Sequence, residues 1–423
     1  MTIELFSRAR RPRHMDQTKD IIMTLATMET FTQYELKLAE RMSRLGTETA
    51  FEVLNKARAL ERQGKDIVHL EIGEPDFDTP KNVVEAGVNA MRKGWTHYGP
   101  SAGLPELRQA IAEDVSRSRG VQVTADEVVV VPGGKPIIFF TLLALADVGD
   151  EVIYPNPGFP IYESMINYAG AKAVPIRLHE ERDFGLDVKE LKALITDRTK
   201  LIIINSPQNP TGGVLSKKDI QGIAEAIGDR NIMVLSDEIY SRLIFEGEHY
   251  SIMTMPGFKE RTILLDGFSK TWAMTGWRMG YGVMRADLAA HIARLNTNSN
   301  SCTASFTQIA GVEAIRGDQS SVEKMRGEFQ RRRDAFVAGL NKIKGFSCRL
   351  PKGAFYVFPN ITKTGWKSKK LADALLEQAG VACLSGTAFG DYGEGYLRFS
   401  VANSLENLNK ALARVDEWTK KNL

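Results

Sequence analysis

Short apolar runs alternate with helix-like segments through the middle of this chain of 423 residues. That alternation predicts parallel strands joined by helical crossovers, in a doubly wound α/β sheet with helices on both faces. Seven strands are expected, near 127–131, 151–154, 172–177, 200–204, 232–235, 262–266 and 280–284.

Polar residues with useful chemistry follow two of these runs. Ligands of such sheets bind where the strands end. Lys270 comes shortly after the run 262–266, and an amine there is a candidate nucleophile toward the aldehyde of pyridoxal phosphate. Ser269 and Arg278 are placed to hold the phosphate. Asp237 ends another run and is suited to pair with the pyridine nitrogen; the alternative is a helix N-cap.

Two further turns supply hydrogen-bond donors. Asn209 lies in the turn after 201–204, and Tyr240 follows Asp237, so either can donate to a ring oxygen. Gly134 and Lys135 stand between a strand and an expected helix, where backbone amides attract an anion. This turn is neither a Walker loop nor a dinucleotide fingerprint.

Arg398 lies inside an apolar run near the C-terminus, from Tyr396 to Ser400. Burying an arginine without an anionic partner is costly. Its planar guanidinium suits a substrate carboxylate, which it can bind through two hydrogen bonds. The alternative is an exposed arginine on an edge strand.

These strings, in this order, resemble the class I aminotransferases, the fold type I family of pyridoxal-phosphate enzymes. They look most like its bacterial aspartate aminotransferase subgroup. The resemblance covers about residues 44 to 420 and leaves residues 1 to 30 outside it. It also rests on Gly73-Glu74-Pro75-Asp76-Phe77, on Tyr98 with Gly103 to Arg108, and on Gly353-Ala354-Phe355-Tyr356.

The resemblance implies a large domain with a mostly parallel seven-stranded sheet and a smaller α+β domain. We expect an N-terminal extension at 1–43, a small domain from 44–73 and 330–423, and a large cofactor-binding domain at 74–329. A helical segment from about 306 to 343 would link the domains. Its charges are expected on the surface: Glu323, Lys324, Glu328 and Arg331 to Arg333.

The resemblance also implies a ping-pong amino acid:2-oxo acid aminotransferase that works through an aldimine on Lys270. Lys270, Asp237 and Tyr240 would be catalytic. Cofactor contacts would come from Gly134, Lys135, Phe159, Asn209, Asp237, Tyr240, Ser269, Lys270 and Arg278. Gly73, Arg398 and Asn209 would bind the substrate. Tyr98 would reach the phosphate of a neighbouring subunit, which implies a homodimer with shared active sites. Phe159 stands where the family often has tryptophan.

Two residues bear on the substrate. By resemblance, Lys135 matches a lysine that attracts the distal carboxylate in aspartate-type members. Glu48 stands near a position where those members have small hydroxyl residues. Its carboxylate would repel a distal carboxylate or pair with Lys135; the alternative is that Glu48 points to solvent.

Composition narrows the function classes. A net charge of +3 is too small to argue for nucleic acid, and no apolar stretch approaches a membrane span. The three cysteines and six histidines show no metal spacing, so no metal is expected. The basic stretch Ser7 to Arg13 lacks the apolar core of a signal peptide, and we expect a cytoplasmic enzyme. An organellar presequence is the alternative.

Two other functions remain as alternatives. A β-lyase, a cyclopropane-forming synthase or an oxidase would keep the same fold and cofactor. A transcription regulator would need an added helix-turn-helix domain, for which the roughly 40 residues before the resemblance are too short.

Overall fold

The computed structural model describes residues 36–423, so the basic stretch Ser7 to Arg13 and most of the expected extension lie outside the described residues. The contacts divide the chain into two units, Met1–Ser43 and Arg44–Leu423. The fold and the site described below belong to the second unit. None of the described helices is long and apolar enough to cross a membrane.

The large sheet has eight strands in the order β2-β9-β8-β7-β6-β3-β4-β5. Their bounds are β2 Val128–Val131, β3 Glu151–Asn156, β4 Lys172–His179, β5 Gly185–Leu186, β6 Thr199–Asn205, β7 Met233–Asp237, β8 Thr262–Gly267 and β9 Gly280–Val283. The pairs β3–β4, β3–β6, β6–β7 and β7–β8 are parallel, whereas β9 is antiparallel to both neighbours. The predicted mostly parallel α/β fold is confirmed. The eighth strand, β5, has only two residues and returns against β4, too short to show a sequence pattern.

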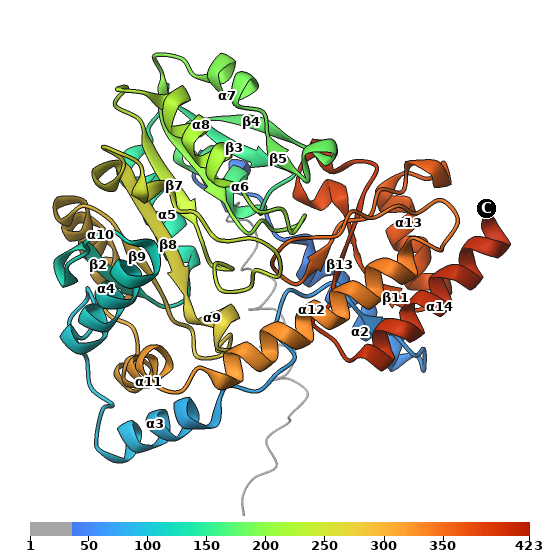
Figure 1. The fold of residues 1–423 in the computed structure, drawn as a ribbon, viewed down its shortest axis with the longest axis horizontal. Coiled ribbons are helices and arrows are strands. Elements are labelled where there is room, and N and C mark those ends of the chain that lie inside the picture. The colour runs from blue at the N-terminus through green and yellow to red at the C-terminus, as the bar shows by residue number, and fades with distance from the viewer. Residues whose placement is uncertain (1–35) are drawn as a thin grey trace, which may run out of the picture. The chain divides into compact units, whose positions relative to one another are not determined.

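Helices cover both faces of this sheet (Figure 1). Both faces are apolar because successive side chains of a strand point to opposite faces of the sheet. In β2 they enter two different hydrophobic cores. Val128 and Val130 pack with α3 Lys81–Arg92, α4 Pro105–Arg119 and α11 Ser305–Arg316. Val129 and Val131 pack with α5 Lys135–Leu145, α6 Ile161–Ala169 and α10 Ala286–Asn300. A third core lies under α7 Val188–Leu194 and α8 Lys217–Ile227.

Two small sheets lie beyond the large one in the chain. The strand β1 Val68–His69 pairs in parallel with β11 Val381–Ala382, and β13 Leu397–Ser400 lies between β10 Tyr356–Val357 and β12 Leu384–Ser385. Around them lie α2 Thr49–Arg62, α12 Ser320–Leu340, α13 Ser368–Ala374 and α14 Leu405–Asn422. Figure 1 shows blue α2 beside the red C-terminal elements. This pairing agrees with the expected small domain, whose boundaries at 73 and 330 remain a prediction.

The remaining elements are short. They are α9 Phe268–Thr271, the 3₁₀ turns η1 Glu40–Arg44, η2 Ala125–Glu127, η3 Glu180–Arg182, η4 Ile252–Thr254, η5 Lys259–Arg261, η6 Thr362–Thr364, η8 Gly386–Phe389 and η9 Asp391–Gly393, and the π turn η7 Leu375–Ala379. They serve mainly as connections between strands and longer helices.

The expectation of a single helical segment from 306 to 343 is wrong in two respects. The segment breaks after Arg316, and a new helix begins at Ser320. Arg332 and Arg333 are also not surface residues, being 6% and 2% exposed. The guanidinium of Arg332 pairs with Asp76 at 2.7 Å, and Arg333 donates to the carbonyl of Pro351. Bound partners from distant segments make burial of these charges tolerable.

Candidate active site

The carboxyl ends of the large-sheet strands border a cavity of about 550 Å³. Side chains that follow β2, β3, β6, β7 and β8 line it, and β13 adds one from the small sheet. The predicted site residues on its wall are Gly73, Gly134, Lys135, Phe159, Asn209, Asp237, Tyr240, Ser269, Lys270, Arg278 and Arg398. Tyr98 is not on this wall, and its side chain is 90% exposed in the single chain.

Lys270 lies in the short helix α9, which follows β8 directly. Its Nζ donates a 2.5 Å hydrogen bond to the carbonyl of Gly73. Burial lowers the pKa of Lys270 to about 8; Glu74 opposes the change, and the nearby cations, Arg398 foremost, add to it. The lowered pKa brings the neutral amine, the form that a nucleophile or base needs, within reach near physiological pH.

Asp237 is a buried carboxylate at the last position of β7. Tyr162 donates to its Oδ2 at 2.6 Å, and the amide of Ile239 lies 3.3 Å from its Oδ1. Burial raises the pKa of Asp237 to about 6, against these hydrogen bonds. No helix follows Asp237, so it is not an N-cap. Its hydrogen-bond partners among the described residues, Tyr162 and the Ile239 amide, are both uncharged, and Asp237 faces the cavity.

Arg398 is buried in β13, the middle strand of its sheet, so the edge-strand alternative does not hold. Its guanidinium donates to Asn209 Oδ1 at 3.2 Å and to the carbonyl of Glu71, and it lies 4.5 Å from the ring centre of Tyr356. Its buried Nε has no hydrogen-bond partner in the described part of the chain. Burial lowers the pKa of Arg398. The group faces the cavity with donors to spare, as expected of a carboxylate-binding arginine.

Glycines and Arg278 form a close-fitting turn at another part of the wall. A Cβ on Gly133, which has a φ of 84°, would lie 2.1 Å from Nη2 of Arg278. A Cβ on Gly280 would lie 2.6 Å from the amide nitrogen of Gly134. Arg278 itself has a positive φ of 53° and donates to the carbonyl of Thr275 at 2.9 Å. Together with Ser269 and the start of α5, these groups make a cradle suited to a phosphate.

Two tyrosines on the cavity wall were not among the predicted site residues. Tyr162 holds Asp237, and the hydroxyl of Tyr356 lies 2.8 Å from that of Tyr240. Tyr356 also explains the glycine at position 73, because a Cβ there would lie 2.0 Å from its hydroxyl. Tyr356 stands in one of the strings that carry the resemblance. The only sequence signal for Tyr162 is that it lies three residues after Phe159, at the start of α6.

A buried network of ion pairs joins the carboxyl ends of β7 and β8. Arg119 pairs with Glu238 at 2.9 Å and with Asp266 at 3.1 Å. Glu238 also contacts His249 Nε2 at 2.7 Å. Glu238 is the neighbour of Asp237, and Asp266 lies in the strand that leads to Lys270. The network therefore fixes both functional groups relative to each other.

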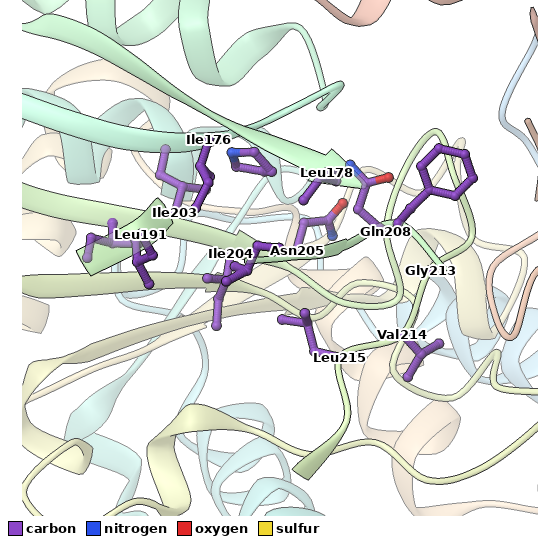
Figure 2. Close-up of a pocket in the computed structure, with 14 residues that line it drawn as sticks. Ile176, Leu178, Leu191, Ile203, Ile204, Asn205, Gln208, Gly213, Val214 and Leu215 are labelled. Carbon is purple, nitrogen blue, oxygen red and sulfur yellow. The ribbon is translucent and has the colours of Figure 1, made fainter. Parts of the chain in front are cut away.

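A second, much smaller cavity lies inside the packed core (Figure 2). Its volume of about 20 Å³ is close to that of one water, and most of its lining is apolar. The two amides beside it are hydrogen-bonded elsewhere: Asn205 to the carbonyl of Asp237 at 3.0 Å and Gln208 to that of Pro157 at 2.8 Å. These hydrogen bonds stabilise the loops that border the larger cavity. The small void is a packing defect in the core and not a binding site.

This fold and site define an enzyme that brings a lysine amine, a buried carboxylate and a buried guanidinium to one cavity. Residues 65–415 match the model of the family Aminotransferase class I and II. The aspartate aminotransferase of Pyrococcus horikoshii is 42% identical over 90% of this chain and 96% of its own length. The aromatic-amino-acid aminotransferase 2 of Thermococcus litoralis is 37% identical over 91% of this chain and 99% of its own length.

A solved structure agrees with these relatives. The aspartate aminotransferase of Thermus thermophilus with maleate has a TM-score of 0.87 and 38% identity, over 90% of this chain and 99% of that one. The chain belongs to the class I and II aminotransferase family. The predicted family, fold class and aminotransferase activity are confirmed.

Proposed function

We propose that this enzyme binds pyridoxal phosphate in the large cavity and transfers amino groups between amino acids and 2-oxo acids. One observation carries the proposal: a lysine amine faces the same cavity as a carboxylate and a guanidinium that have no ion-pair partner among residues 36–423. These groups match, in charge, the aldehyde and ring nitrogen of the cofactor and the carboxylate of an amino acid.

The residues present fit the cofactor. Lys270 is the amine for its aldehyde, and Asp237 is the anion for its ring nitrogen. Ser269, Arg278 and the backbone of Gly134 would hold the phosphate. Tyr240 and Asn209 would donate to the ring oxygen, and Phe159 would cover one face of the ring. When bound, pyridoxal phosphate supplies an aldehyde that condenses with amines and a ring that withdraws electrons from the adjacent carbon.

The chain's own groups then orient the substrate and move the proton. Arg398 would bind the α-carboxylate, which fixes Cα beside Lys270. The Lys270 amine, with its pKa lowered to about 8, would take the Cα proton and later return it. Asp237, held by Tyr162, would remain ionised opposite the protonated ring nitrogen. The donor leaves as a 2-oxo acid, and a second 2-oxo acid then enters the same site.

A homodimer is part of the proposal. Tyr98 is 90% exposed in the single chain, yet by resemblance it contacts a phosphate. A twofold partner would bring the Tyr98 side chain to a site, and such symmetry is the default for soluble oligomers. The cytoplasmic location remains a prediction.

The test separates amino transfer from other reactions of the same cofactor. The protein loaded with pyridoxal phosphate receives an amino acid but no acceptor. About one equivalent of 2-oxo acid per chain should form and then stop, until an added 2-oxo acid restores the cofactor. Continued turnover without acceptor, with release of ammonia or consumption of oxygen, would instead identify a lyase or an oxidase. Lys270→Ala is the control and should release nothing.

A further inference from the structure

Glu48 and Lys135 form an ion pair on the wall of the active-site cavity. Glu48 precedes α2 in an extended conformation, and its side chain makes no capping hydrogen bond to that helix. It reaches instead to Lys135, the first residue of α5. The side chain of Glu48 is only 22% exposed, so it does not simply point to solvent.

Lys135 has this one acidic partner among the described residues, so the net charge of the pair is zero. Its Nζ lies 5.5 Å from the ring centre of Phe159. The apolar residues Ala50, Phe51 and Ile138 line the same cavity. Apart from the pair, this part of the wall offers a substrate side chain apolar contacts.

We propose that Glu48 sets the donor specificity of this enzyme by neutralising Lys135, so that amino acids with uncharged side chains are preferred over dicarboxylates. This inference rests on the proposed function and names its substrate class. It sets this chain apart from the aspartate aminotransferases that it resembles in sequence.

The expected preference for uncharged side chains follows from the negative charge that Glu48 places beside Lys135. The distal carboxylate of a dicarboxylate would have to displace Glu48 from Lys135 or lie beside a like charge, and either is unfavourable. Glu48 also acts on the Arg398 side of the cavity: burial lowers the pKa of Arg398, and Glu48 is among the negative groups that oppose the change. An uncharged side chain can rest against Ala50, Phe51 and Ile138 without disturbing the pair, and Arg398 remains available for the α-carboxylate of the same substrate.

Removing Glu48 should leave the fold intact. Its partner Lys135 is 45% exposed, and exposed ion pairs contribute little to stability. Glu48→Gln therefore frees a hydrated lysine rather than stranding a buried charge. Glu52→Gln is a matched control, because Glu52 lies one turn along in α2, loses the same charge and lines a separate cavity.

The experiment is a double-mutant cycle on the holoenzyme with Glu48→Gln, Lys135→Ala and both changes together. Binding of maleate and of 3-phenylpropionate, which do not react, is measured by calorimetry. The kcat/KM values for aspartate and phenylalanine are measured with one common acceptor. We expect the wild type to favour phenylalanine and 3-phenylpropionate. Glu48→Gln should raise the aspartate-to-phenylalanine ratio and the relative affinity for maleate about tenfold.

The gain should vanish when Lys135→Ala is added, and Glu52→Gln should leave both ratios unchanged. The inference is overturned if Glu48→Gln leaves both ratios at the wild-type values, or if the gain persists without Lys135. A holoenzyme that binds the two acids as expected but turns over no amino acid would contradict the proposed function instead.

Discussion

Tyr162 donates a 2.6 Å hydrogen bond to Oδ2 of Asp237, and both side chains are buried. The tyrosine comes from α6, the aspartate from the end of β7, and the bond joins two layers of the fold. It keeps the carboxylate ionised against burial, which raises the pKa of Asp237 to about 6.

Tyr162→Phe should therefore impair catalysis without blocking the cavity. Loss of the hydroxyl raises the pKa of Asp237 further, so the acidic limb of kcat/KM should move to higher pH. We expect kcat/KM at pH 7 to fall about tenfold or more, as befits a hydrogen bond to a charged group. A pH profile identical to that of the wild type would show that Tyr162 only fills space.

Arg398→Ala should impair every amino acid donor, whatever its side chain. The guanidinium orients Cα as well as binding the carboxylate. Its loss should therefore raise the activation free energy by several kcal/mol, which lowers kcat/KM about a thousandfold or more. Simple amines without a carboxylate should be poor donors for the wild type and lose little in the variant. Amines that outperform α-amino acids in the wild type would contradict the carboxylate role.

His69 should make stability depend on pH. Its hydrogen bond to Glu71 raises the pKa of His69 to about 9, with Glu61 adding to the shift against burial. The folded state thus binds the proton more tightly, and the stabilisation is complete below pH 6.5 and is lost as pH rises through about 9. Denaturant unfolding should show a loss of about 2 kcal/mol across this window, less than the full shift because the imidazole is 30% exposed. In His69→Gln the slope should flatten; an unchanged slope would assign it to other groups.

The homodimer is tested by light scattering together with a Tyr98 variant. The mass should be twice the 47.0 kDa of one chain. Tyr98→Phe should weaken retention of the cofactor, because the phosphate loses a donor. Full activity at the monomer mass would rule out shared sites.

Much of this architecture could be predicted from local pattern. All seven expected strands formed. Most of them are buried runs of apolar residues, a pattern that can be read from the sequence, and Asp237 and Lys270 stand at or just after the ends of two such runs. The pattern failed where long-range partners decide the outcome. Arg332 and Arg333 look like a solvated helix face, yet Asp76 and the Pro351 carbonyl bind them inside the protein.

The active site, like the fold, has some residues that the sequence pattern identifies and others that depend on long-range contacts. Asp237 and Lys270 could be found from their positions at the ends of apolar runs, and Arg398 from its place inside one. The Tyr162–Asp237 hydrogen bond and the Glu48–Lys135 pair could not, because they join segments far apart in the chain. For Glu48 the sequence left repulsion, pairing and exposure open together. The structure selects the pair, because it brings Glu48, just before α2, to Lys135, the first residue of α5.

The most direct test of the account is chemical capture of the cofactor. The protein loaded with pyridoxal phosphate is reduced with borohydride, digested and mapped by mass spectrometry, with Lys270→Ala treated alongside. The account predicts one phosphopyridoxyl group per chain, attached to Lys270. It predicts that the Lys270→Ala variant carries no such group at position 270 and has lost turnover. A group on another lysine, or a Lys270→Ala protein with normal turnover, would contradict it.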